Sequence, residues 1–246
     1  MRDYTRGRRC LMQLLQESLD DATATACGRC SVCLGTLPDP LESEPSVETV
    51  RTIATALRAR SHELEPRKMW PGGAFGKRGR IPAESAADPG RVLVHADAPE
   101  WRSLVTASQG GDRDAHQQLA EACVGVLTQW RGSWAERPEV AVSLDTGGLS
   151  AAVEVVTDHL AQVGRLARSV LTVVGDPPPN DLAGPAEAAH WDAVVSVAEP
   201  DAVRGRTVLL VVDRSASQWP VTVAAAKLRE AGASRVLPLL IHRTPG

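Results

Sequence analysis

Cysteine side chains near the start of the chain have the type and the spacing of a metal site. Cys27, Cys30 and Cys33 are separated by two residues each, and Cys10 lies upstream of them. Tetrahedral zinc takes four soft ligands, and a short C-x2-C turn presents two sulfur atoms to one ion without strain. The spacing therefore predicts a structural Zn²⁺ site formed by Cys10, Cys27, Cys30 and Cys33.

Two other chemistries for these thiols stay open, a redox-active pair and a different metal. A thioredoxin-like C-x-x-C pair opens a helix after a strand, and no strand is expected before Cys27. A disulfide framework is disfavoured because closely spaced cysteines seldom meet the bridge distances and because the chain has an odd number, five. The fifth, Cys123, falls in the apolar stripe of a helix expected over residues 115–130, which assigns it to the core.

Basic side chains are the second group with a possible chemistry. The net charge of the chain is -3, but residues 51–80 hold eight Lys and Arg against two acidic residues. Lys and Arg neutralise phosphates, and an interleaved aromatic ring can stack on a base. The alternative is a solvated basic surface with Trp70 packed in the core. The candidate residues for binding single-stranded or junction DNA are Arg8, Arg9, Arg29, Arg67, Lys68, Trp70, Lys77, Arg78 and Arg80.

A third group of side chains follows an apolar run near the C-terminus. Asp213 ends this run, and Ser215, Ser217 and Trp219 come directly after it. Apolar runs alternate here with amphipathic helices, which predicts a parallel sheet covered on both faces. Such sheets bind ligands at the carboxyl ends of their strands, where Asp213 would lie. The strands are expected over residues 140–144, 171–175, 207–213 and 236–241, and the helices over residues 151–165 and 221–231.

Helices at the front of the chain must hold the cysteines and the basic residues. Four leucines after Cys10 share one helical face, so Cys10 begins a helix and the other three cysteines lie on the loop after it. Residues 38–45 have the composition of a linker, and Ser46 caps a helix expected over residues 46–60. The expected domains are a helical zinc-binding subdomain, a basic helix with a short β or loop unit, and an α/β domain, over residues 1–37, 38–98 and 99–246.

Several functions are disfavoured by what the sequence lacks. No apolar run reaches the roughly 18 residues of a membrane span, and no apolar segment typical of a signal peptide follows the N-terminus. Crowded thiols suit a reducing compartment, so we expect a cytoplasmic protein without a membrane partner. In the stretch nearest to a G-x-x-x-x-G-K-[ST] loop, Arg78 stands where a Mg²⁺-binding hydroxyl is required. We therefore expect no catalytic residues and no ATP hydrolysis from this chain alone.

The cysteine motif resembles that of a known family. A helix-borne Cys10 followed by C-G-x-C-x-x-C is similar, over residues 4–35, to the zinc-binding subdomain of RecQ-family DNA helicases. The resemblance implies the non-motor C-terminal region of an ATP-dependent helicase, with structural zinc, DNA binding, the ATPase lobes as a partner, and a role in DNA repair and recombination. A winged helix follows in that family. Residues 62–84 are too short and too glycine-rich for a complete one, so a shortened, winged-helix-like unit is expected.

The C-terminal stretch TVLLVVDRSASQWPVTVAAAKLREAGASRVLPLLI is similar to type I phosphoribosyltransferases. In that family, acids after the strand bind ribose hydroxyls and the loop binds a 5-phosphate. The resemblance implies a phosphate and ribose site at Asp213, Ser215, Ser217 and Trp219.

This chain departs from that pattern at the residues that do the chemistry. Val212 replaces the first acid, and Gln218 replaces a loop glycine. A second possible anion turn, Ser143–Gly148, is expected to lack a nearby Arg or Lys that could hold pyrophosphate. We expect a degenerate site; the alternatives are a nucleotide- or phosphoribosyl pyrophosphate-binding enzyme or sensor, and a protein-interaction module.

Overall fold

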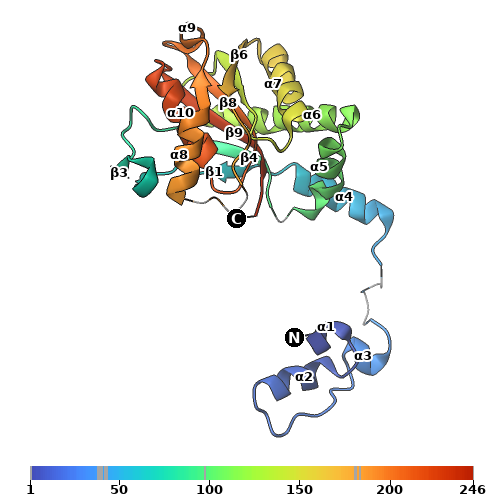
Figure 1. Ribbon diagram of the computed structural model, residues 1–246. Helices are drawn as coiled ribbons and strands as arrows, with labels where there is room; N and C mark the ends of the chain where they lie inside the picture. Colours follow the sequence, from blue (N-terminus) through green and yellow to red (C-terminus); the bar gives the residue numbers. More distant parts are fainter. Residues whose placement is uncertain are drawn as a thin grey trace. The chain divides into compact units, whose positions relative to one another are not determined.

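The computed structural model describes residues 2–37, 41, 44–96, 98–179, 182 and 184–245. The chain divides into two compact units, residues 1–53 and 54–246, which we describe separately (Figure 1). Most of the linker expected over residues 38–45 lies outside the described residues. The expected boundary at residues 98–99 falls inside the second unit.

The first unit consists of short helices around the cysteine motif. These are α1 (Arg2–Arg6), α2 (Leu11–Ser18), α3 (Ser31–Leu34) and the start of α4 (Val47–Arg58). Cys10 is the N-cap of α2, where its Sγ accepts a hydrogen bond from the backbone N–H of Gln13. Ser46 Oγ accepts from the Thr49 N–H at 3.1 Å, as an N-cap does. The helices expected after Cys10 and after Ser46 are confirmed.

The second unit is built on a seven-stranded sheet with the strand order β1-β4-β9-β8-β5-β6-β7. The five central strands run parallel, and the edge strands β1 and β7 are antiparallel to their neighbours. All four strands expected from the sequence are present and parallel. The strands are β1 (His62–Leu64), β4 (Gly90–Val94), β5 (Val140–Leu144), β6 (Ala167–Val173), β7 (Val195–Val197), β8 (Thr207–Ser215) and β9 (Arg235–Arg243).

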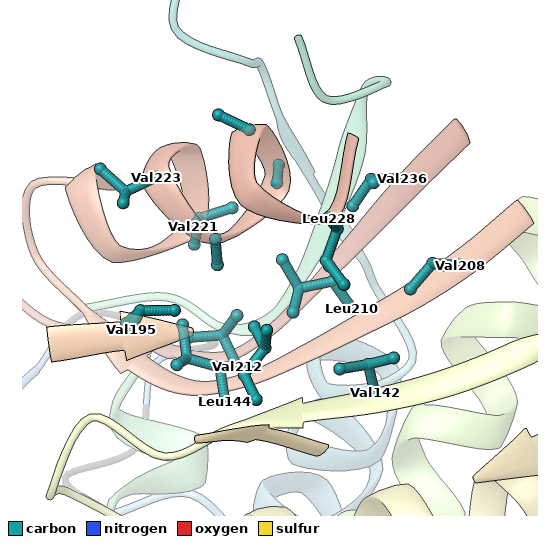
Figure 2. Packing of buried hydrophobic residues seen from close by; sticks show 14 of the residues in the cluster. Val142, Leu144, Val195, Val208, Leu210, Val212, Val221, Val223, Leu228 and Val236 are labelled. Atoms are coloured by element: carbon teal, nitrogen blue, oxygen red, sulfur yellow. The ribbon is translucent and has the colours of Figure 1, made fainter. Parts of the chain in front are cut away.

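Helices cover both faces of this sheet, as the unbroken Val and Leu runs predict. In the central strand β8, every residue but Arg214 is buried. Figure 2 shows Leu210 and Val212 of this strand facing Val221 and Leu228 of the helix that follows. One face carries α8 (Gly184–Val194), α9 (Pro200–Val203) and α10 (Trp219–Glu230); the other carries α5 (Arg102–Gln109), α6 (Arg113–Trp130) and α7 (Ser150–Gly164). The fold class is therefore α/β with a mainly parallel sheet.

The basic middle segment is divided between two sheets. Strands β1 and β4 belong to the main sheet, whereas β2 (Met69–Pro71) and β3 (Arg78–Arg80) form a separate two-stranded hairpin. We call residues 68–80 the basic hairpin. The remaining short elements are the 3-10 helices η1 (Gly73–Phe75), η2 (Pro99–Trp101) and η3 (Arg131–Ser133). Among the described residues, no helix is both long and apolar enough to cross a membrane.

Candidate functional site

The four cysteines of the N-terminal motif lie together in space. Their sulfur atoms are all within 4.8 Å of one another, and Cys10 Sγ lies 3.9 Å from Cys30 Sγ. Four sulfurs around one zinc at about 2.3 Å are about 3.8 Å apart, so this set fits a tetrahedral ion. Backbone N–H groups of Gln13 and Cys27 donate to Cys10 Sγ, the kind of outer-sphere contact that orients a metal ligand. The residues can hold a metal ion.

Hydrogen bonds within the cluster shift the pKa values of two of these thiols. A backbone N–H from Leu11 helps to lower the pKa of Cys30 to about 6. The hydrogen bond with Cys30 helps to raise the pKa of Cys33 to about 11. Neighbouring thiolates repel one another, and a cation bound among them would offset this repulsion. Cys123, by contrast, is fully buried in α6, and burial raises its pKa to about 12.

A pocket of about 440 Å³ opens in the second unit at the carboxyl ends of the parallel strands. It lies at a topological switch point, because β5 leads to β6 on one side and β8 leads to β9 on the other. Its walls come from Thr146 after β5, residues 177–179 after β6, residues 214–217 after β8, residues 244–245 after β9, and Glu187 and Trp191 of α8. The candidates Ser215 and Ser217 are in this wall.

Asp213, the candidate ribose ligand, is fully buried and engaged within the protein. One of its carboxylate oxygens accepts from the N–H and the hydroxyl of Thr146, at 2.8 and 2.6 Å. The other accepts from the N–H groups of Gly148 and Leu149, at 2.8 and 2.9 Å. Leu149 is the N-cap of α7, so Asp213 joins β8 to the start of that helix. This carboxylate serves the fold, and its oxygens are not free to bind a sugar.

In the loop after β8, serine hydroxyls accept hydrogen bonds from backbone N–H groups of the same loop. Ser215 Oγ accepts from the Gln218 N–H at 3.0 Å, and Ser217 Oγ accepts from the Trp219 N–H at 3.1 Å. Pro220 has no N–H to offer. Gln218 has a φ of +68°, the left-handed conformation in which glycine is favoured. Trp219 itself is buried in the core. Side chains of the loop therefore occupy two of its N–H groups.

Arg214 is the pocket residue that sequence reasoning missed. Its side chain crosses the turn after β5 so closely that a Cβ atom on Gly148 would overlap its Cδ. A Cβ on Gly147 would likewise overlap Pro177. The turn was expected to lack a basic neighbour, and that expectation was wrong because the arginine comes from β8. Leu144 pairs with Val212, which sets the turn after β5 beside the end of β8. Arg214 follows Asp213 in the sequence, and the parallel neighbours β5 and β8 end at the same edge of the sheet. These two facts together could have predicted Arg214 beside this turn.

The candidate DNA-binding residues fall into three environments. Lys68, Arg78 and Arg80 are exposed on the basic hairpin, and among the described residues none is in an ion pair. Lys77 is exposed but lies 3.3 Å from Glu230. Trp70 is 8% exposed and packs on Phe75, so it belongs to the core rather than to a stacking surface.

The other basic candidates are not on the hairpin surface. Arg67 is half-buried against the pocket loop, where it donates to the Ser217 carbonyl. In the first unit, Arg8 and Arg29 are exposed, and Arg9 pairs with Glu17 at 2.6 Å. The structure thus brings five of the nine candidates together on one hairpin, four of them as exposed basic side chains.

Comparisons with known proteins found distant likenesses only. No family model and no curated protein matches the chain. One similar solved structure is an allosteric regulatory enzyme of purine biosynthesis, at 17% identity and a TM-score of 0.34, over 51% of this chain and 26% of that one. Another is a purine phosphoribosyltransferase from Pyrococcus horikoshii Ot3, at 16% identity and a TM-score of 0.32, over 61% of this chain and 87% of that one.

Proposed function

We propose that residues 54–246 bind a small anionic ligand of the nucleotide or phosphoribosyl pyrophosphate class at the switch-point pocket, without transferring a phosphoribosyl group. The observation that carries the proposal is Arg214, whose side chain lies against Gly148 at the wall of this pocket. A guanidinium held in place by a glycine turn is suited to a phosphate or carboxylate, which it can bind with two hydrogen bonds. Pockets at such switch points are common ligand sites.

Binding without transfer is favoured by the state of the other pocket groups. The four hydrogen bonds to Asp213 leave it unable to hold ribose hydroxyls or a metal bridging to them. Glu187 is the acidic residue lining the pocket, and it accepts a hydrogen bond from Ser217 Oγ at 2.6 Å. The loop N–H groups of Gln218 and Trp219 are also engaged, and the hydroxyls of Thr146 and Ser217 donate within the protein, so the proposal relies on Arg214 as the charged donor of the pocket wall.

Calorimetric titration tests this function. The wild-type chain is titrated with phosphoribosyl pyrophosphate and with ribose 5-phosphate, each with and without Mg²⁺. Arg214→Gln should weaken binding about tenfold or more, because a charge-assisted hydrogen bond contributes about 1.5–3 kcal/mol. Gly148→Ala should do the same by displacing the Arg214 side chain. Arg102→Gln, at an exposed position on α5, is the matched control. Absence of binding to the wild type, or equal binding by Arg214→Gln, would contradict the proposal.

A second candidate function is contact with nucleic acid through the basic hairpin, within the RecQ-like helicase context that the cysteine motif suggests. Its support is the exposure of Lys68, Arg78 and Arg80 without carboxylate partners among the described residues. Because the indole of Trp70 is in the core, we propose phosphate contacts rather than base stacking. The affinity for a fluorescent single strand and for a junction is measured against salt. Each Lys or Arg to Gln change should lower the salt slope by about one; a salt-independent affinity would rule this function out.

For the N-terminal unit, we propose that the metal is zinc and that its role is structural. The four-cysteine donor set favours it, since a catalytic zinc keeps one position for water whereas four protein ligands close the site. The ion would join the start of α2 to the loop before α3 and to α3 itself, which carry the other three cysteines.

A further inference from the structure

We propose that Arg67 links the basic hairpin to the pocket loop, so that order in the hairpin and occupancy of the pocket rise and fall together. The pocket half of this inference rests on the proposed function. Its structural half concerns only the contact between two segments of the second unit, and can be tested without any ligand.

The first step is the contact of Arg67 itself. Its Nε and Nη2 both donate to the backbone carbonyl of Ser217, with Nε at 2.9 Å. Its guanidinium also lies over the Trp219 ring, 4.0 Å from the centroid. Burial lowers the pKa of Arg67. The negative charge of Glu187 partly offsets this shift, and the positive charge of Arg243 adds to it. A half-buried arginine that donates two hydrogen bonds and stacks on an aromatic ring is held in one position.

The second step is that Ser217 belongs to the pocket. Its hydroxyl donates to Glu187 of α8 at 2.6 Å and accepts from the Trp219 N–H at 3.1 Å. The Ser217 carbonyl thus accepts hydrogen bonds from Arg67, and the Ser217 side chain joins α8 to the start of α10. Ser217 and Glu187 both line the pocket. If Arg67 leaves, the Ser217 carbonyl loses both of these donors, and the pocket wall loses one of the contacts that hold it.

The third step is that Arg67 immediately precedes the basic hairpin, which rests on the same two helices. Gly73 packs so tightly on Pro185 of α8 that an added Cβ would lie 3.1 Å from the proline Cβ. Lys77 pairs with Glu230 of α10 at 3.3 Å. Trp70 is in the core cluster that contains Trp191, another pocket residue. The hairpin is therefore attached to both helices that bound the pocket.

These contacts define two states and the sign of the coupling between them. With Arg67 on the Ser217 carbonyl, the pocket wall is formed and the base of the hairpin is fixed. With Arg67 released, the pocket wall and the base of the hairpin both gain conformational freedom. A ligand that needs the formed wall binds the first state better and must shift the population toward it. By reciprocity, whatever orders the hairpin must tighten ligand binding by the same factor.

Hydrogen exchange on the full chain tests the link. In the wild type, phosphoribosyl pyrophosphate should slow amide exchange over residues 68–80 as well as over residues 215–219. Arg67→Lys keeps the charge but loses the planar fork and the ring stacking. This variant should lose the ligand-induced protection of the hairpin and bind about fivefold more weakly. Arg102→Lys, an equal change at an exposed site on α5, should behave as the wild type.

The outcomes separate this inference from the proposed function. If the ligand binds and Arg67→Lys retains full affinity and hairpin protection, the link is overturned while the binding function stands. If the wild type binds no ligand, the proposed function fails, and the ligand-free comparison decides: Arg67→Lys must speed exchange over residues 215–219 about fivefold relative to Arg102→Lys. Equal exchange in the two variants would overturn the link.

Discussion

At the scale of single residues, Asp213 shows how one buried carboxylate can hold two elements together. Its two oxygens accept four hydrogen bonds from the turn after β5 and the start of α7. These hydrogen bonds give both oxygens of a fully buried side chain the partners that such a group needs. The same side chain therefore holds the turn that Arg214 crosses, and its effect on the pocket is indirect.

Asp213→Asn should lower the free energy of unfolding by about 2–4 kcal/mol. Asparagine has one acceptor oxygen, and its NH2 group would face backbone N–H donors of the turn. The measurement is chemical denaturation of the variant against the wild type. Asp176→Asn, at an exposed position, is the control and should change the stability little. A stable Asp213→Asn protein would show that the turn does not depend on the carboxylate.

His242 should make the stability depend on pH. Burial lowers its pKa from the ordinary value of 6.5, and the charge of Arg214 lowers it further. The folded state thus binds the proton more weakly than the unfolded state, so this contribution is complete above pH 6.5 and is lost as the pH falls through the folded pKa. Melting temperatures measured from pH 8 to pH 5 should fall more steeply for the wild type than for His242→Gln. Parallel curves for the two proteins would exclude this residue as the cause.

At the scale of elements, the loop between β8 and α10 contains a left-handed residue that is not a glycine. Gln218 takes the left-handed conformation just before α10, and Pro220 lies in the first turn of that helix. The cost of this conformation is about 1–2 kcal/mol for a residue with a Cβ. The loop is held by its serine hydroxyls and by the contact of Arg67 with the Ser217 carbonyl.

Gln218→Gly should raise the free energy of unfolding by about 0.5–1 kcal/mol, because glycine adopts this φ without strain and the gain exceeds its added unfolded-state entropy. The N–H that donates to Ser215 is kept. Gln218→Val should be destabilising, since a β-branched side chain tolerates positive φ poorly. Thermal melts of the three proteins give the order; a glycine variant less stable than the valine variant would contradict it.

The long buried elements could be predicted from the sequence, whereas the short ones could not. Continuous apolar runs marked the strands β5, β6, β8 and β9, and helical periodicity marked α6, α7 and α10. Strands β1 and β7 have three residues each, too few for a pattern. The cysteine cluster was predicted because its ligands are close in sequence. Arg214 was missed because its partner, Gly148, lies on a different strand exit, and only the sheet order joins them.

At the scale of the whole molecule, the two units have different sources of stability. The second unit has two apolar clusters, one on each face of its sheet. In the first unit, Cys10 is buried, but Leu19 is 81% exposed and Leu34 is 50% exposed. A unit with so little buried apolar surface needs a cross-link or a metal to hold its fold.

Removal of the metal should therefore unfold the first unit alone. A chelator should increase amide exchange over residues 10–34 and leave the melting of residues 54–246 unchanged. Native mass spectrometry should find one zinc ion per chain, lost in Cys33→Ser. In the matched variant Cys123→Ser the ion should be retained while the melting temperature falls, because that thiol is in the sheet's core. A chelator that lowered the melting temperature of both units would contradict this independence.

The two edges of the main sheet bear on how this protein behaves at high concentration. A long open strand at an edge offers unpaired backbone groups to the strands of other molecules, and parallel Val-rich strands are the most hazardous. Here the parallel strands are enclosed by β1 and β7, which are three residues long and antiparallel to their neighbours. Glu63 of β1 is exposed and pairs with Arg91 of β4, which adds charge at one edge. The sheet thus ends in two short caps that discourage strand-to-strand aggregation.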